Sequence, residues 1–196
     1  MPTNRQNTLG KEVPMGKKIL VPVADGTEEL EAVGIIDVLR RAEAEVTVAS
    51  VGQLQITASR GVQLIADKLI ADCVGVVYDL VVLPGGIPGA DHLRDSEELT
   101  RILKCQNEKG GFFGAICASP AIILEHHGLL IGRKATCHPA YTDQLSNTDG
   151  IKSKVVVDGN CITSQGAGTV IDFALKLVEL LYGRERRESV AGSMAI

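Results

Sequence analysis

Runs of consecutive apolar residues alternate with segments of helical periodicity through most of the chain. Each run has the length of a strand that is buried on both faces. The predicted strands are residues 17–25 (KKILVPVAD), Glu45–Val51, Tyr78–Leu83 and Phe112–Ile116. The predicted helices are Thr27–Ala42, Ser96–Lys109, Ser119–His127 and Thr169–Tyr182. This alternation predicts a single-domain α/β fold, with a doubly wound, mostly parallel sheet and helices on both faces.

The pattern is weaker in several connecting segments. Short strands are expected at residues 54–57 and 62–65, and another at Lys134–Cys137. The turn Asp158-Gly159-Asn160 separates two apolar triplets and predicts a hairpin of Val155–Val157 with Cys161–Thr163. Thr27 and Asp95 stand where helix caps are expected.

The two ends of the chain differ in composition from its middle. The first sixteen residues are polar and lack the apolar core of a signal peptide. We therefore predict a flexible extension over residues 1–16, a folded domain over 17–183 and a charged, poorly packed tail over 184–196. A role of the extension in organelle targeting stays open.

Composition excludes several classes of protein. A formal charge of −4 gives no excess of basic residues that would attract nucleic acid or an anionic membrane surface. No apolar run approaches the roughly 20 residues that span a bilayer. The five cysteines (Cys73, Cys105, Cys117, Cys137 and Cys161) are odd in number and lack metal-ligand spacing. We expect a reducing, cytoplasmic setting and no metal site.

The segment FFGAICASPA contains the strongest chemical signal. Cys117 follows a predicted strand and precedes a helix, and the residues two positions away on either side, Ala115 and Ser119, are small. This spacing is typical of a tight turn that presents a nucleophile. Backbone N–H groups at the start of the helix would favour a thiolate. The alternative is a small buried cysteine without reactivity.

Other candidate residues also follow predicted strands, where ligands bind in such folds. Glu31 lies among apolar residues of its helix, so burial would hold its proton and let it donate to a thiolate; a surface glutamate is the alternative. Gly85 and Gly86 could offer backbone N–H groups to an oxyanion, although many turns contain such a pair. His138 is a possible base or a structural histidine.

Five segments together resemble the ThiJ/PfpI superfamily, and within it the DJ-one branch. The resemblance runs from about Lys17 to Gly183, with the motifs in order. The segments are ADGTEELEAV (Ala24–Val33), DLVVLPGGIPGA (Asp79–Ala90), GAICASPAIILEHHG (Gly114–Gly128), ATCHPAY (Ala135–Tyr141) and TSQGAGTVIDFAL (Thr163–Leu175).

The resemblance implies roles for the candidate residues. Cys117 matches the reactive, easily oxidised cysteine, Glu31 its protonated partner and His138 the nearby histidine. The residues that match the pocket for an oxyanion or a cysteine sulfinate are Gly85, Gly86 and Ala118, the last through its N–H.

The resemblance also implies a flavodoxin-like homodimer without a cofactor. One expected function is conversion of methylglyoxal to lactate, or removal of early glycation adducts from a glycated substrate. The other is a redox sensor, a chaperone or a stress-signalling protein with a protein partner, in which Cys117 is oxidised to the sulfinate.

Some positions depart from the pattern. Ala118 stands where the protease-like branch has histidine, which counts against peptidase activity. Gln165 and Ala167 replace the arginine and proline that are frequent in the DJ-one branch, leaving Arg41 and Arg60 as the nearby cations.

Overall fold

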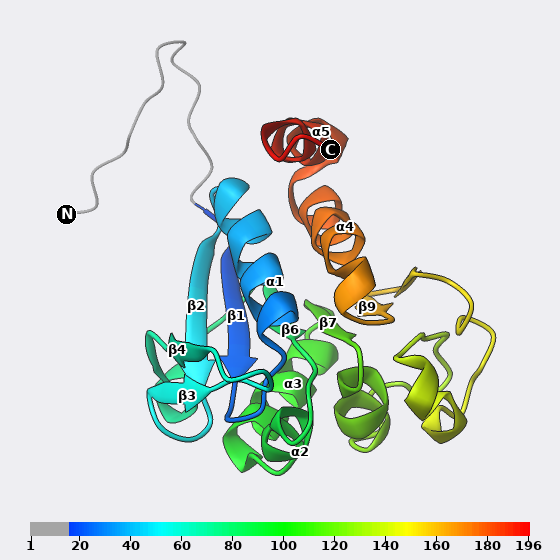
Figure 1. The fold of residues 1–196 in the computed structure, drawn as a ribbon. Coiled ribbons are helices and arrows are strands. Elements are labelled where there is room, and N and C mark those ends of the chain that lie inside the picture. The colour runs from blue at the N-terminus through cyan, green and yellow to red at the C-terminus, as the bar shows by residue number, and fades with distance from the viewer. Residues whose placement is uncertain (1–15) are drawn as a thin grey trace.

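The computed structural model describes residues 16–196, and its centre is a seven-stranded sheet (Figure 1). The predicted extension over residues 1–16 lies outside this range except for Gly16. The strands are β1 (Lys18–Val23), β2 (Glu45–Ser50), β5 (Lys68–Leu69), β6 (Leu80–Leu83), β7 (Phe112–Ile116), β8 (Val155–Asp158) and β9 (Cys161–Ser164). Their order is β5-β2-β1-β6-β7-β9-β8, and every pair is parallel except the predicted β8–β9 hairpin.

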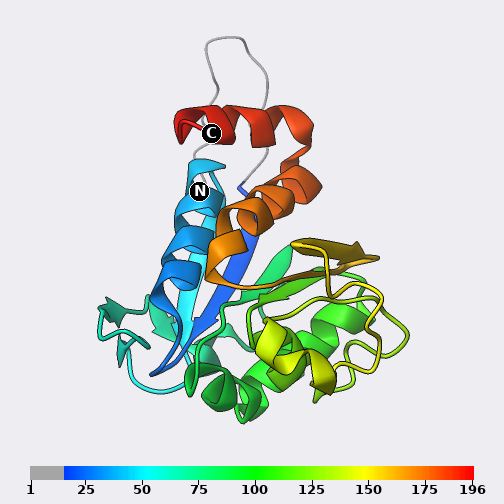
Figure 2. The same ribbon diagram turned by 45° about the vertical axis from the view of Figure 1, so that its right-hand side comes forward.

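Helices cover both faces of this sheet. On one face α1 (Glu29–Arg41) packs beside α4 (Val170–Tyr182), as Figures 1 and 2 both show. On the other face lie α2 (Gly89–Arg94), α3 (Glu97–Glu108) and the helical turn Pro120–Glu125. The predicted doubly wound α/β fold is therefore confirmed.

The strands are continuous apolar runs because each contributes to two cores. In β1, Ile19 and Val21 join the core beneath α1 and α4, whereas Leu20 joins the core beneath α2 and α3. Alternate side chains of a strand point to opposite faces, so a strand covered on both faces needs apolar residues at every position.

The topology places the chemistry at one edge of the sheet. From β1 the chain continues to β2 on one side, and β6 pairs with β1 on the other side. From β6 the chain continues to β7, which lies on the side away from β1. The loops that leave the carboxyl ends of β1 and β6 therefore run in opposite directions, which opens a site between them. The N–H of Glu28 donates to the carbonyl of Gly85 at 2.8 Å and joins the two loops.

Several details differ from the sequence predictions. Helix α1 is capped by the Glu28 carboxylate and α3 by Ser96, rather than by Thr27 and Asp95. The segment 54–65 forms a separate hairpin of β3 (Gln55–Thr57) and β4 (Gln63–Ile65).

The predicted strand Lys134–Cys137 is wrong. The N–H groups of Lys134 and Thr136 donate to the side chains of Asp158 in β8 and Thr163 in β9, rather than to backbone carbonyls of a strand. The segment is therefore not part of the sheet.

The predicted poorly packed tail is also wrong. Residues 184–193 form α5 (Arg184–Ser193), which buries Val190 and Ala191. Figure 2 shows α5 lying across the end of α4, and an ion pair of Arg186 with Glu43 joins it to the segment after α1. Among residues 16–196, every helix is too short or too polar to cross a bilayer.

Candidate active site

Cys117 occupies a strained turn directly after β7. Its φ of 64° is in the left-handed region, which is costly for a residue with a side chain and occurs at functional sites. Two backbone hydrogen bonds hold it: its N–H donates to Ser164 at 3.0 Å, and the N–H of His138 donates to its carbonyl at 2.7 Å. The side chain is half-buried. The surrounding fold thus presents the thiol in a fixed position.

Glu31 lies in the first turn of α1 and is completely buried. Its Oε2 accepts a hydrogen bond from the N–H of Gly85 at 2.7 Å, whereas its Oε1 has no hydrogen-bond partner. The pKa of this carboxyl is raised to about 7, chiefly by burial and to a lesser extent by the nearby Glu28 charge. The Gly85 N–H and the Cys117 thiol lower it. Glu31 therefore exchanges a proton near neutral pH.

The two glycines after β6 have different roles in the structure. A Cβ on Gly85 would lie 2.5 Å from the Cβ of Cys117 and 2.9 Å from Oε2 of Glu31, so only glycine fits. Because its N–H is bonded to Glu31, Gly85 is not available as an oxyanion donor. Gly86, with a φ of 94°, offers its N–H to the Cys117 sulfur together with Ala118.

The N–H groups at the start of the helix were expected to lower the pKa of the Cys117 thiol. This prediction is wrong when Glu31 is ionised. Burial raises the pKa of the Cys117 thiol to about 12, and the Glu31 carboxylate adds to the rise. The N–H groups of Ala118 and Gly86 act in the opposite direction but are outweighed. Negative charges on both the Cys117 sulfur and the neighbouring Glu31 carboxyl would repel each other. A thiolate at this site consequently requires that Glu31 carries the proton.

His138 is exposed and lies at the rim of the site. Its Nδ1 accepts a hydrogen bond from the N–H of Ala140 at 3.2 Å, so the neutral ring carries its hydrogen on Nε2. Within residues 16–196, the His138 ring makes no hydrogen bond to Cys117, and the two residues are joined only by the backbone bond described above. The arrangement suits donation by Nε2–H better than proton removal.

Gly166 is a site residue that the sequence reasoning missed. A Cβ at this position would lie 3.9 Å from Cys117 Sγ, 3.9 Å from Glu31 Oε1 and 3.5 Å from His138 Cδ2. The three predicted catalytic side chains therefore converge on one point. The segment TSQGAG, which begins in β9 and continues past its end, contained the signal, because a glycine that follows a strand permits close approach of the backbone.

Arg41, one of the two cations expected near the site, is remote from it. Arg41 lies at the far end of α1 from Glu31, about 15 Å away by helical rise, and pairs with Asp37. The amide of Gln165 donates to the carbonyl of Ile151. Arg41 thus contributes nothing to the site within this chain.

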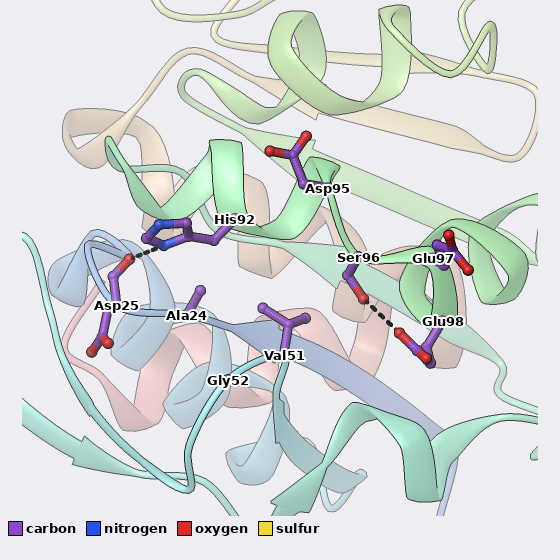
Figure 3. A pocket seen from close by; sticks show the side chains of 9 residues that line it. All are labelled: Ala24, Asp25, Val51, Gly52, His92, Asp95, Ser96, Glu97 and Glu98. Carbon is purple, nitrogen blue, oxygen red and sulfur yellow. Dashed lines mark hydrogen bonds between the residues drawn. The ribbon is translucent and has the colours of Figure 1, made fainter.

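A separate hollow opens elsewhere along the same edge (Figure 3). This cleft has a volume of about 550 Å³ and contains none of the residues around Cys117. Its lining residues are Ala24, Asp25, Val51, Gly52, His92, Asp95, Ser96, Glu97 and Glu98. Across residues 16–196, no group of three or more histidine, cysteine or carboxylate side chains is placed to hold a metal.

Comparisons with known proteins place this chain in one family. The profile of the DJ-1/PfpI family matches residues 17–180, which is most of the chain. The chain belongs to the DJ-1/PfpI family. The predicted resemblance to this family is therefore confirmed.

Individual family members match over most of this chain. Protein DJ-1 homolog B of Arabidopsis thaliana is 54% identical over 170 residues, which are 86% of this chain and 39% of that protein. The chain thus spans less than half of that relative and of its paralogue, DJ-1 homolog A. A glutathione-independent glyoxalase, DJR-1.2 of Caenorhabditis elegans, is 34% identical over 88% of this chain and 91% of that protein.

The fold matches solved structures of the family. The oxidized DJ-1 of Toxoplasma gondii superimposes with a TM-score of 0.88 and 46% identity, covering 92% of this chain and 98% of that structure. The flavodoxin-like architecture of this DJ-1/PfpI chain is shared with it.

Proposed function

We propose that this protein is a cysteine-dependent, stress-protective member of the DJ-1/PfpI family that converts reactive dicarbonyls such as methylglyoxal to hydroxy acids. The observation that supports this proposal most strongly is that a half-buried thiol adjoins a buried carboxyl whose pKa is about 7. A nucleophile beside a proton carrier of this pKa suits proton transfer at neutral pH. The relative named as a glutathione-independent glyoxalase supports this choice. The same chemistry would remove early glycation adducts.

The proposed reaction needs no external oxidant or reductant. The Cys117 thiolate attacks the aldehyde carbon, and protonated Glu31 gives its proton to the aldehyde oxygen, which forms a hemithioacetal. The Glu31 carboxylate then removes the hydrogen from that carbon as a proton and returns it to the adjacent carbon, while the hydroxyl proton of the first carbon moves to the neighbouring ketone oxygen. The first carbon becomes the carbonyl of a lactoyl thioester. Water hydrolyses the thioester to lactate and the thiol. The N–H groups of Gly86 and Ala118 stabilise the oxyanions.

Lactate formation from methylglyoxal in thiol-free buffer tests this function. We expect Cys117→Ala to lower turnover on the order of a thousandfold, because the nucleophile is lost. Cys105→Ala removes an exposed cysteine outside the site and serves as the matched control that keeps turnover. Equal turnover by the parent and Cys117→Ala would contradict the proposal.

A second function is favoured by the unpartnered Oε1 of Glu31. A protonated carboxyl oxygen beside the Cys117 sulfur could hold a sulfinate formed by peroxide, as a redox sensor requires. If the parent makes no lactate and mass spectrometry shows peroxide modifying Cys117 before Cys105, the sensor function replaces the enzymatic one.

We also propose a homodimer. Leu30 and Val33 of α1 and Ile65 of β4 are 57%, 47% and 77% exposed, and Val33 and Ile65 line one shallow groove. An apolar strip of this kind is typical of a protein interface. We expect the parent to sediment as a dimer and Ile65→Lys as a monomer, while Ile131→Lys, at an exposed residue outside the strip, stays dimeric. A monomeric parent would contradict the proposal.

A further inference from the structure

The peptide group between Pro84 and Gly85 is hydrogen-bonded on both sides. Its carbonyl accepts a hydrogen bond from Ser119 Oγ at 2.6 Å. Its N–H donates to Glu31 Oε2 at 2.7 Å. The carbonyl and the N–H of a trans peptide point in opposite directions and share one conjugated π system. A continuous chain of hydrogen bonds therefore leads from Ser119 through this peptide to Glu31.

Both ends of this chain are shielded from water. Ser119 and Glu31 are each 0% exposed. Ser119 lies two residues after Cys117, in the turn that follows β7, and its hydroxyl bridges this turn to the loop after β6. Hydrogen bonds in such surroundings are electrostatically strong, and consecutive bonds polarise one another. A hydroxyl that donates to the Pro84 carbonyl thus makes the Gly85 N–H a stronger donor.

We propose that Ser119 is a positioning residue that acts on the Glu31 carboxyl through the Pro84–Gly85 peptide. The proposal rests on the proposed function, in which Glu31 carries the proton. Ser119 has no contact with the reacting atoms in this scheme. It strengthens and orients the hydrogen bond from the Gly85 N–H to Glu31 Oε2.

The direction of the effect follows from the groups around Glu31. Glu28 from the cap of α1 and Cys117 from the turn after β7 are the titratable groups that act on it, and His138 lies across Gly166. The Gly85 N–H stabilises the ionised carboxylate against burial. A weaker Gly85 donor therefore leaves Glu31 protonated to a higher pH.

Carbon-13 NMR of protein labelled at the glutamate carboxyl carbons measures this titration directly. Glu31→Gln identifies the Glu31 resonance. We expect Ser119→Ala to raise the Glu31 midpoint by about half a pH unit, roughly a threefold change in the dissociation constant. Thr136→Val removes another buried hydroxyl that donates to a backbone carbonyl, that of Ile151, and should leave the midpoint unchanged. A purely structural role of Ser119 would alter stability in Ser119→Ala without moving the midpoint, and this result would overturn the proposal.

A second measurement on the parent protein does not depend on a variant that folds. The Ser119 Cβ resonance and the Gly85 amide should titrate with the Glu31 midpoint. A Gly85 amide that titrates while Ser119 stays constant would also overturn the proposal. Neither readout needs turnover. If the protein makes no lactate but Ser119→Ala shifts the Glu31 midpoint, the proposed reaction is refuted and the positioning role of Ser119 stands. If the protein is active but the midpoint does not move, only the positioning role is refuted.

Discussion

As the pH rises from 4.5 to about 7, the unfolding free energy of the parent protein is expected to fall by about 3 kcal/mol more than that of a Glu31→Gln variant. The cause is the buried carboxyl, whose pKa is raised from 4.5 to about 7. In this window the unfolded chain has released the proton and the folded protein still binds it. Stability from Glu31 is therefore complete below pH 4.5 and disappears as the pH rises through 7. Urea unfolding of both proteins at several pH values measures the difference.

The comparison between variants is needed because other carboxylates act in the opposite direction. The pKa of Glu29, which is bonded to Ser59 and Arg60, is lowered on folding, and so is that of Asp95 beside Arg94. Glutamine keeps the acceptor for Gly85 and removes only the titration. Glu108→Gln, at an exposed residue of α3, controls for the loss of one carboxyl. Parallel stability profiles for the parent and Glu31→Gln would show that folding does not raise the pKa of Glu31.

The sequence was sufficient for the fold because the sheet is covered on both sides. Strands such as β1 and β6 then need apolar residues at every position, which is a local and visible pattern. The short helix α2 gave no such signal, since GADHLR contains a single large apolar residue. In α5 the two buried residues are outnumbered by charged ones that face solvent. Both elements depend on tertiary packing that sequence periodicity does not report.

The candidate site was predictable where a residue type is unusual for its place. A cysteine between small residues after a strand and a glutamate among apolar neighbours both indicated chemistry, and the structure places them together at Gly166. The direction of the Cys117 pKa was not predictable, because it depends on burial and on the charge of Glu31 across the fold. For the same reason the sequence could not show that the Gly85 N–H is bonded to Glu31.

These observations imply that Cys117 and Glu31 share a single negative charge. Ionisation of Glu31 raises the pKa of the thiol, so anions on both the half-buried Cys117 and the buried Glu31 would be strongly unfavourable. The reactive form of the pair is therefore the thiolate with a protonated Glu31. Any change that separates these two side chains should reduce reactivity even if both residues remain.

Replacing Gly85 by alanine applies this argument most directly. The new Cβ would lie 2.5 Å from Cys117 Cβ, 2.9 Å from Glu31 Oε2 and 3.0 Å from the carbonyl oxygen of Ile116. The Cys117 Cβ and the Ile116 carbonyl are fixed by the backbone, so the turn after β7 and the loop after β6 must move apart. We expect a loss of about 3 kcal/mol of unfolding free energy. Displacement of the thiol by about 1 Å should also slow alkylation of Cys117 on the order of a hundredfold.

Gly168→Ala is the matched control for this change. Gly168 lies in the same region, between Gly166 and α4, but a Cβ there would meet no atom within 4 Å. Its stability should stay within about 0.5 kcal/mol of the parent, and Cys117 should react at the parental rate. Urea unfolding and iodoacetamide alkylation followed by mass spectrometry measure both quantities. If Gly85→Ala alkylates as fast as Gly168→Ala, then reactivity does not depend on the contact between Cys117 and Glu31, and the shared charge is not what controls the thiol.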